Sequence, residues 1–233
     1  MKHAFVTGST RGIGSAVAEK LIQNGYHVFI NGRYKCPEIS LTQDCYTYIQ
    51  ADMSTLKGVN KFAKAVLAET QKLDCIVLNT GVTCRNSFRN IEYSDWQCVM
   101  DTNVNMPFFI IKEFHDFIVG GGVIVFISSI LSIKPHAASI PYGVSKAAVN
   151  MLAQSLVKEF APRGIRVNVV CPGFIDTEWQ KEKPEALRTK IEDKIALNRF
   201  GTPREVADIC FSLVENTYMN GAVVSLDGGY DFV

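Results

Sequence analysis

The sequence has almost no charge imbalance and no long hydrophobic run, and each absence excludes a class of protein. Its 233 residues include 24 Lys and Arg and 23 Asp and Glu, which leaves a formal net charge of +1. This balance gives no electrostatic reason to expect a nucleic acid or an anionic membrane as partner. No run approaches the ~18 apolar residues of a membrane span, and the first apolar stretch is too short for a signal-peptide core. We therefore expect a cytoplasmic protein that binds neither nucleic acid nor membranes.

Paired metal-binding motifs are also absent. The seven cysteines are odd in number, form no CxxC pair and are scattered through apolar stretches, at Cys36, Cys45, Cys75, Cys84, Cys98, Cys171 and Cys210. This usage is typical of reduced thiols that serve as small hydrophobic side chains. The histidines show no HxH or HExxH spacing and stand at His3, His27, His115 and His136. The sequence therefore predicts no catalytic metal.

Hydrophobic residues make up 47% of the chain, which is enough for a sizeable core. Short apolar runs alternate along the sequence with longer stretches of helical period. The expected strands are residues 3–7, 27–31, 46–50, 75–79, 123–128, 166–171 and 222–226. The expected helices are residues 12–24, 54–71, 93–119, 142–161 and 203–215.

Several expected strands, among them 75–79 and 123–128, are continuous apolar runs without polar alternation. Strands buried on both faces look like this, as parallel strands do beneath helices. The strand–helix alternation therefore predicts one α/β domain over residues 1–233, a doubly wound, Rossmann-type parallel sheet in three layers. Such a sheet places its ligand site at the carboxyl ends of the strands. Residues 174–200 interrupt the alternation, and we interpret this charged, helix-prone stretch as a substrate lid.

The first expected strand runs into a glycine-rich turn, TGSTRGIG, at residues 7–14. Glycines at a strand-to-helix turn let backbone N–H groups approach a phosphate, and the helix N-terminus adds a favourable dipole. The spacing is GxxxGxG and differs from the common GxGxxG fingerprint, so a plain tight turn is the alternative. The position directly after the first strand favours a nucleotide-binding loop.

The end of the second expected strand carries a basic residue and no nearby carboxylate. Arg33 lies there, and Arg11 of the glycine-rich turn can approach the same place. An acidic residue would accept from the 2′-hydroxyl of NAD, whereas guanidinium groups suit the 2′-phosphate of NADP. Two solvated surface arginines are the alternative. We predict that NADP(H) is preferred, with NAD(H) as the second choice.

An ordered set of motifs spans essentially the whole chain. Besides TGSTRGIG it comprises Asp52, Asn79-Thr80-Gly81, Asn103, Ser129, Tyr142-Gly-Val-Ser-Lys146, Pro172-Gly173 and Asp227-Gly228-Gly229. A lone YxxxK is frequent by chance, but this order, with each motif near a strand end, is very specific. The set resembles the short-chain dehydrogenase/reductase family, and in detail its 3-oxoacyl-[acyl-carrier-protein] reductase branch. The resemblance implies hydride transfer between a nicotinamide cofactor and a carbonyl or secondary alcohol.

The spacing of Tyr142 and Lys146 also suits proton transfer on physical grounds. Residues i and i+4 share one face of a helix, which brings the ammonium close to the phenol. A phenol has a pKa of ~10 and needs a neighbouring cation to act as a base near neutral pH. Ser129 follows a strand, where its hydroxyl can hydrogen-bond a developing oxyanion, and Ser128 is the alternative. For the Tyr–Lys pair the alternative is an ordinary amphipathic helix face.

The resemblance assigns a role to each of these side chains. It implies that Tyr142 is the general acid in reduction and the general base in oxidation. Lys146 would lower the pKa of Tyr142 and hold the nicotinamide ribose, while Ser129 orients the carbonyl. Asn103 would hold a water that links Lys146 to a proton relay.

The resemblance also implies a set of cofactor contacts. Asp52 would accept from the adenine amino group, and a helix cap ahead of Ser54 is the alternative. Thr80 replaces the alanine usual in the family, and we do not expect this change to abolish binding. The implied cofactor-binding residues are Gly8, Ser9, Thr10, Arg11, Gly12, Ile13, Gly14, Arg33, Asp52, Met53, Asn79, Gly81, Tyr142, Lys146, Pro172, Gly173, Ile175 and Thr177.

The expected helix 93–119 is apolar on more than one face, with large side chains at Met100, Met106, Phe108, Phe109, Phe114 and Phe117. One face can pack on the sheet, but a second face is hard to bury within a monomer. Family members commonly form tetramers through this helix, so we expect a homotetramer, with a dimer as the fallback.

The substrate is the least constrained part of the interpretation. We expect a small-molecule or acyl-thioester carbonyl, with 3-oxoacyl thioester reduction as the leading version. A dehydrogenase of a sugar, steroid or small secondary alcohol is one alternative, and a regulator that binds the nucleotide without turnover is another. The charges in residues 174–200 are typical of a solvated helix surface. Arg166 and Lys158 are candidates for contact with an acidic carrier protein.

Overall fold

The computed structural model describes residues 1–34, 43–135, 139–181, 183–230 and 232. Cys36 and His136, which belong to the cysteine and histidine sets above, lie outside the described residues. No helix in these ranges is long and apolar enough to cross a membrane. Within the same ranges, no three His, Cys, Asp or Glu side chains gather into a group that could hold a metal ion.

The centre of the molecule is a seven-stranded sheet in the order β3-β2-β1-β4-β5-β6-β7. Every neighbouring pair is parallel. The strands are β1 (Lys2–Val6), β2 (Tyr26–Gly32), β3 (Tyr46–Gln50), β4 (Leu73–Leu78), β5 (Ile118–Ile127), β6 (Arg166–Pro172) and β7 (Val223–Leu226). The strand order reverses between β1 and β4, and a doubly wound sheet binds its ligand at the carboxyl ends beside such a reversal. The predicted fold class is confirmed.

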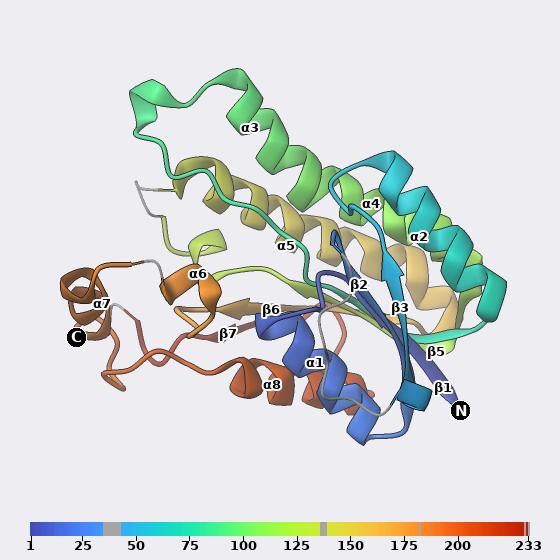
Figure 1. Ribbon diagram of the computed structural model, residues 1–233. Helices are drawn as coiled ribbons and strands as arrows, with labels where there is room; N and C mark the ends of the chain where they lie inside the picture. The colour runs from blue at the N-terminus through green and yellow to red at the C-terminus, as the bar shows by residue number, and fades with distance from the viewer. Residues whose placement is uncertain (35–42, 136–138, 182, 231, 233) are drawn as a thin grey trace.

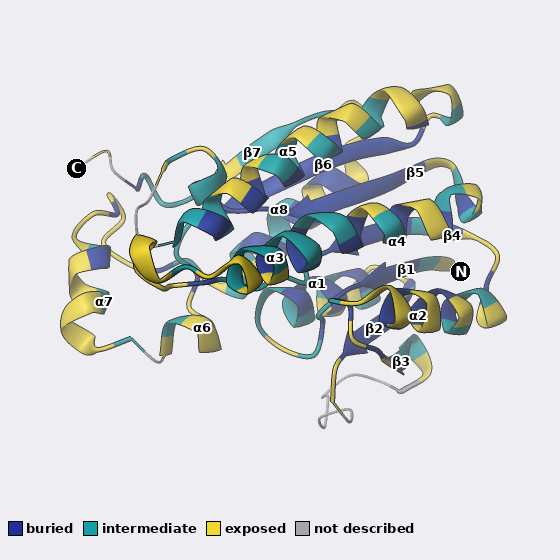
Figure 2. Cartoon of the chain, turned by 90° about the horizontal axis from the view of Figure 1, so that it is seen from above, coloured by how far each residue is buried: buried dark blue, intermediate teal, exposed yellow. Residues whose placement is uncertain are grey.

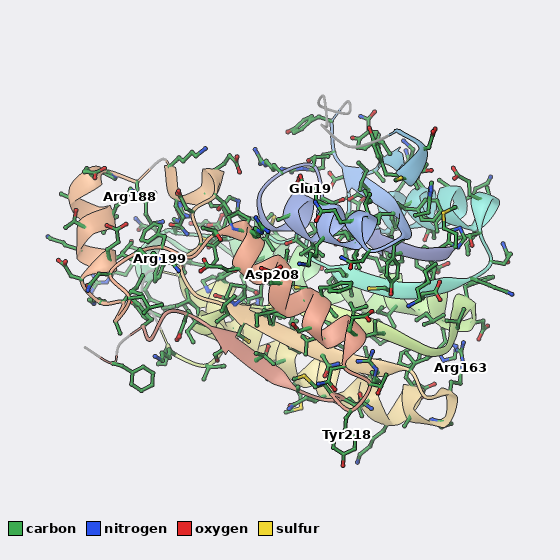
Figure 3. All side chains as sticks on the ribbon, turned by 90° about the horizontal axis from the view of Figure 1, so that it is seen from below. Glu19, Arg163, Arg188, Arg199, Asp208 and Tyr218 are labelled. Atoms are coloured by element: carbon green, nitrogen blue, oxygen red, sulfur yellow. The ribbon has the colours of Figure 1, made fainter. Side chains whose placement is uncertain are left out.

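Helices cover both faces of the sheet, so the molecule has three layers (Figure 1). The helices are α1 (Gly12–Gln23), α2 (Leu56–Glu69), α3 (Tyr93–Met100), α4 (Met106–Phe114), α5 (Ile140–Phe160), α6 (Glu178–Lys181), α7 (Glu185–Glu192) and α8 (Pro203–Glu215). Helices α2, α4 and α5 pack on one face, and α1 and α8 pack on the other. An ion pair between Lys20 and Asp208, with an N–O distance of 2.7 Å, joins α1 to α8. Asp208 is labelled on α8 in Figure 3.

Burial follows the layers. The inner strands and the inward helix faces are buried, whereas exposed residues gather on the outer helix faces and along α7 (Figure 2). The aromatic rings of Phe5, Phe62 and Phe114 contact one another in the core between β1, α2 and α4. Edge-to-face and tilted arrangements of this kind add to the stabilisation from burial.

The stretch 93–119 corrects the sequence prediction of a single helix. Between α3 and α4 the backbone forms a π-helical turn, η3 (Asp101–Asn105), and after α4 a short 3₁₀ turn leads into β5. Pro107 stands near the start of α4 and has no N–H to donate to the preceding turn, which explains the break in the helical ladder. Strand β5 begins at Ile118, five residues before the expected 123, and includes Gly121 at φ +81°.

Arg166 corrects a second expectation, because it is buried and not available to a carrier protein. Its guanidinium donates to the backbone oxygens of Leu213 at 2.6 Å and Val214 at 2.7 Å, at the end of α8. It also donates to the oxygen of Met219 at 3.3 Å. The side chain therefore satisfies carbonyl groups that the end of a helix leaves free.

Candidate functional site

A single cavity of about 1160 Å³ opens at the carboxyl ends of the strands. It is larger than the ~300–1,000 Å³ of a site for one drug-sized ligand, so a dinucleotide and a substrate fit together. Its walls come from the glycine-rich turn, the ends of β2, β4, β5 and β6, the start of α5, and α6 and α7. The predicted residues that line it are Gly8, Thr10, Arg11, Gly12, Ile13, Arg33, Met53, Asn79, Gly81, Ser129, Tyr142, Lys146, Pro172, Gly173, Ile175 and Thr177.

The glycine-rich turn forms one end of the cavity. Gly8 and Gly12 adopt φ values of +63° and +57°, which side-chain-bearing residues rarely adopt. A Cβ on Gly14 would lie 2.4 Å from the Gly8 oxygen, so only glycine lets α1 approach the turn this closely. The Asn79 amide donates to the oxygens of Thr7 and Gly8 at 3.1 and 3.0 Å, and thereby holds the turn against the end of β4.

The start of α1 suits a diphosphate. Its N-cap residue, Arg11, makes no side-chain hydrogen bond to the first N–H groups of the helix. Free N–H groups at a helix N-terminus favour a bound anion. At Gly8, a Cβ would lie 3.0 Å from the Thr80 hydroxyl, so the backbone surface is open there only because the residue is glycine. These residues fit the phosphates of a nicotinamide dinucleotide.

Three predicted cofactor residues support the site from outside the cavity. The Ser9 hydroxyl donates to the Val6 oxygen at 2.6 Å and accepts from the Asn31 N–H at 2.8 Å, which ties the turn to β1 and β2. Gly14 provides the close helix contact described above. A carboxylate oxygen of Asp52 accepts from the N–H and the hydroxyl of Ser54 at 3.0 and 2.7 Å, in the turn ahead of α2. The N-cap of α2 is Thr55, whose side chain accepts from the Gly58 N–H, so Asp52 is not the helix cap.

Ser129, Tyr142 and Lys146 meet in the middle of the cavity. Ser129 follows β5, and Tyr142 and Lys146 lie in the first two turns of α5. The Tyr142 hydroxyl is hydrogen-bonded to the Ser129 side chain. Lys146 is only 4% exposed, and its ammonium nitrogen lies 5.7 Å from the centre of the Tyr142 ring. The i and i+4 spacing thus produces the neighbourhood that the sequence predicts.

Burial dominates the electrostatics of Tyr142 and Lys146. It raises the pKa of Tyr142 to about 12, and the hydrogen bond from Ser129 opposes this rise only in part. Burial also lowers the pKa of Lys146 to about 8. The ammonium donates to the Ile127 oxygen at 2.8 Å. The expected lowering of the Tyr142 pKa by Lys146 stays a prediction.

Asn103 lies behind the cavity, on the π-helical turn η3. Its side-chain oxygen accepts from the Val82 N–H at 2.8 Å, and its amide donates to the Val82 oxygen at 2.9 Å. The same amide donates to the Ser145 hydroxyl at 2.9 Å, which links the segment after β4 to α5. The role of Asn103 in holding a relay water stays a prediction.

Sequence reasoning missed the side chains that form the substrate end of the cavity. The ring of Trp179 contacts that of Tyr142, with the ring centres 6.2 Å apart. Basic and apolar residues continue the wall: Arg85, Ile130, Leu131, Phe174, Lys183, Leu187, Lys190, Ile191 and Lys194. On α7, the spacing of Leu187, Lys190 and Ile191 at i, i+3 and i+4 was a signal that these side chains share one face.

Comparison with known proteins identifies the family. A family model described as short chain dehydrogenase matches residues 2–188. The chain is 31% identical over 239 residues to the 3-oxoacyl-[acyl-carrier-protein] reductase FabG of Aquifex aeolicus, with 98% of this chain and 96% of that protein covered. It is 35% identical over 244 residues to a 3alpha-hydroxysteroid dehydrogenase of Mediterraneibacter gnavus, with 97% and 96% covered.

Solved structures agree with this result. The Pseudomonas aeruginosa RhlG/NADP active-site complex superposes with a TM-score of 0.92 at 29% identity, covering 99% of this chain and 96% of that one. The match is one of fold over nearly the whole of both chains. The chain belongs to the short-chain dehydrogenase/reductase family and is an oxidoreductase that acts on CH–OH or C=O groups with NAD(P).

Proposed function

We propose that the protein is an NADP(H)-dependent oxidoreductase that interconverts a carbonyl and a secondary alcohol. The observation that carries the proposal is the lining of the cavity, which brings Ser129, Tyr142 and Lys146 together with the glycine-rich turn and with apolar side chains such as Leu187. A protein that only bound the nucleotide would have no use for a serine and a tyrosine hydroxyl at this position. The alternative of a regulator without turnover is therefore disfavoured.

Each of the three side chains has a task in the reaction. The bound nicotinamide supplies or accepts the hydride at the substrate carbon. In reduction, Ser129 donates a hydrogen bond to the carbonyl oxygen, where negative charge develops. Tyr142 then gives its proton to that oxygen. Because the Tyr142 pKa is about 12, the phenol is protonated at neutral pH and ready to act as this acid.

Lys146 completes the group as a buried cation. Its charge stabilises the phenolate that remains after proton transfer, and its N–H groups suit the ribose hydroxyls of the cofactor. Asn103 holds the adjoining segment in place through Val82 and Ser145. The hydride from the cofactor and the proton from Tyr142 together convert the carbonyl to the alcohol.

The preference for NADP(H) rests on Arg11 and Arg33. Both residues are exposed and line the cavity, Arg33 directly after β2 and Arg11 in the glycine-rich turn. The carboxylate among the described lining residues is that of Glu178, whose Oε2 would lie 3.8 Å from a Cβ on Gly12. The Pseudomonas aeruginosa structure named above is an NADP complex. A 2′-phosphate would meet two permanently charged donors at this place.

We expect Arg33→Ala to weaken NADPH binding by roughly 10- to 100-fold and to leave NADH binding nearly unchanged, since only the 2′-phosphate contact is lost. Fluorescence titration of both cofactors measures the two dissociation constants. Arg204→Ala is the matched control, because Arg204 is an exposed arginine on α8 and does not line the cavity. An unchanged NADPH-to-NADH affinity ratio in Arg33→Ala, or a wild-type protein that prefers NADH, contradicts the assignment.

The leading substrate class is a 3-oxoacyl thioester, and a steroid or other secondary alcohol is the second candidate. The first is supported by the resemblance to the Aquifex aeolicus reductase and the second by that to the Mediterraneibacter gnavus dehydrogenase. Spectrophotometric turnover with a panel of 3-oxoacyl thioesters, hydroxysteroids and small ketones distinguishes them. Tight cofactor binding would overturn the proposed function if the oxo compounds of the panel did not oxidise NADPH and the hydroxysteroids did not reduce NADP⁺.

The cytoplasmic location and the homotetramer stay predictions. Phe108 on α4 and Val144 and Met151 on α5 are 43%, 44% and 64% exposed. These apolar side chains lie on helices that also cover the sheet, so a second copy of the chain has an apolar surface to cover.

A further inference from the structure

The charged side chains that line the cavity are unevenly distributed. Among the described lining residues the acidic one is Glu178, and the basic ones are Arg11, Arg33, Arg85, Lys146, Lys183, Lys190 and Lys194. Arg11 and Arg33 belong to the cofactor end, and Lys146 belongs to the reacting group. The other four cations, Arg85, Lys183, Lys190 and Lys194, line the part of the cavity that we assign to the substrate.

The sides of the lid differ in charge. Glu185 and Asp193 belong to the same stretch of chain as Lys190 and Lys194, yet only the two lysines line the cavity. A solvated helix surface mixes the two signs. Here the cations face the cavity and these carboxylates do not, which is the pattern of a wall built for an anion.

Helix α7 and the residues after it combine this charge with apolar surface. Leu187, Lys190, Ile191 and Lys194 are spaced at i, i+3, i+4 and i+7 and all line the cavity. Residues at this spacing share one face of a helix. A ligand along this face therefore meets apolar side chains and ammonium groups in alternation.

Among the described residues, Lys183 and Arg85 have no counter-ion of the kind that their neighbour Arg188 has. Arg188 on α7 (Figure 3) pairs with Asp176 at an N–O distance of 3.3 Å and lies over the Phe200 ring at 4.5 Å. In the described part of the chain, neither Lys183 nor Arg85 makes an ion pair. Burial and the positive charges of Arg85 and Arg188 lower the pKa of Lys183, which places these three cations near one another.

We propose that the substrate carries an anionic group, held by Arg85, Lys183, Lys190 and Lys194, at the end of an apolar segment that runs from the reacting carbonyl along Trp179 and α7. The inference rests on the proposed function and narrows its substrate class. The anionic group is a carboxylate of the substrate itself or a phosphate of a thioester carrier, since both have the same chemistry at this wall.

Matched substrate pairs test the proposal and separate the two sources. The first pair is a 3-oxoacyl coenzyme A and the N-acetylcysteamine thioester of the same acyl chain, which lacks the phosphates. The second pair is a fatty acid with a ketone inside its chain, at the end far from the carboxylate, and the methyl ester of that acid. We expect the charged member of at least one pair to have a KM about tenfold lower or more, and this advantage to shrink at high salt.

The variants show whether the proposed cations are responsible. In the double variant Arg85→Met with Lys183→Met, we expect the ratio of the KM of the neutral substrate to that of the charged substrate to fall about tenfold. The kcat and KM for the neutral substrate should stay within about twofold of the wild-type values. Lys181→Met is the matched control, because Lys181 is an exposed lysine on α6 that does not line the cavity. Equal KM values within both pairs, or an advantage that the double variant keeps, overturn the inference while the proposed function stands.

If none of the four substrates turns over, the inference is tested by binding alone, and the full panel still decides the proposed function. Calorimetric titration of the oxo acid and its ester into the NADPH-loaded protein then replaces kinetics. Tighter binding of the acid that Arg85→Met with Lys183→Met abolishes supports the anion site, and equal binding of acid and ester overturns it.

Discussion

Replacement of Tyr142 by Phe is expected to lower kcat by roughly 10²- to 10⁴-fold, because the phenol is the proposed proton donor to the substrate oxygen and a phenyl ring has no proton to give. The phenyl ring fills the same volume, so the contact with Trp179 and the packing of α5 persist. Steady-state kinetics with the best substrate of the panel measure the loss. Cofactor affinity and the midpoint of thermal unfolding are expected to stay close to those of the wild type.

Tyr218 offers a matched control for this substitution. It is 98% exposed and lies on the connection between α8 and β7, away from the cavity (Figure 3). Tyr218→Phe should leave kcat unchanged. A Tyr142→Phe variant that kept most of its rate would remove the phenol from the mechanism and leave Ser129 or water as the proton source.

The second large effect concerns the stability of the protein without cofactor. Lys146→Met should abolish activity and at the same time raise the free energy of unfolding at pH 7 by about 1–2 kcal/mol. A pKa lowered from 10.5 to about 8 means that burial of the charged lysine costs on the order of 3 kcal/mol. Loss of the hydrogen bond to the Ile127 oxygen offsets about 1 kcal/mol of that gain.

The sign of the pH dependence follows from the same values. Below about pH 8, Lys146 is charged in both the folded and the unfolded protein, so the full cost of burial is present. Between pH 8 and 10.5 the folded protein has lost the proton and the unfolded chain still binds it, so wild-type stability rises relative to the variant. Urea unfolding at pH 7 and pH 9.5 should therefore show the advantage of Lys146→Met shrinking.

Lys158 provides the comparison within the same helix. It is exposed in the last turn of α5, so Lys158→Met should change stability by less than about 0.5 kcal/mol and show no such pH dependence. If Lys146→Met proved less stable than the wild type at pH 7, the buried ammonium would be a stabilising group and not a functional residue held at a cost.

The parts of the fold that could be predicted are those that leave a local pattern in the sequence. The seven strands, and the placement of the motifs near strand ends, could be predicted, because buried parallel strands and strand-end glycines leave strong local patterns. The π-helical turn η3 could not be predicted, because the apolar residues around Pro107 have the period of one long helix. The start of β5 at Ile118 could not be predicted either, because its three glycines, Gly120 to Gly122, are typical of a turn.

The same distinction applies to the functional site, where the positions of the residues could be predicted but their electrostatics could not. The convergence of Ser129, Tyr142 and Lys146 could be predicted from helical spacing and strand ends, but the direction of the Tyr142 pKa could not. Desolvation depends on how much of the tertiary structure surrounds a group, and no spacing in the sequence reports that. The sequence predicts a solvated surface for the charges of residues 174–200, and Lys181, Glu185 and Lys190 are indeed exposed. Which of these charged side chains also line the cavity, as Lys190 does, depends on the fold.

The paired hydrogen bonds of Asn103 have a consequence for how the enzyme can diverge. One amide side chain satisfies both backbone groups of Val82 and also secures Ser145, so the floor beneath the reacting atoms is preorganised by the polypeptide itself. Helices α6 and α7 share none of these bonds. Substitutions there can retarget the enzyme to new molecules while the chemical step is inherited intact.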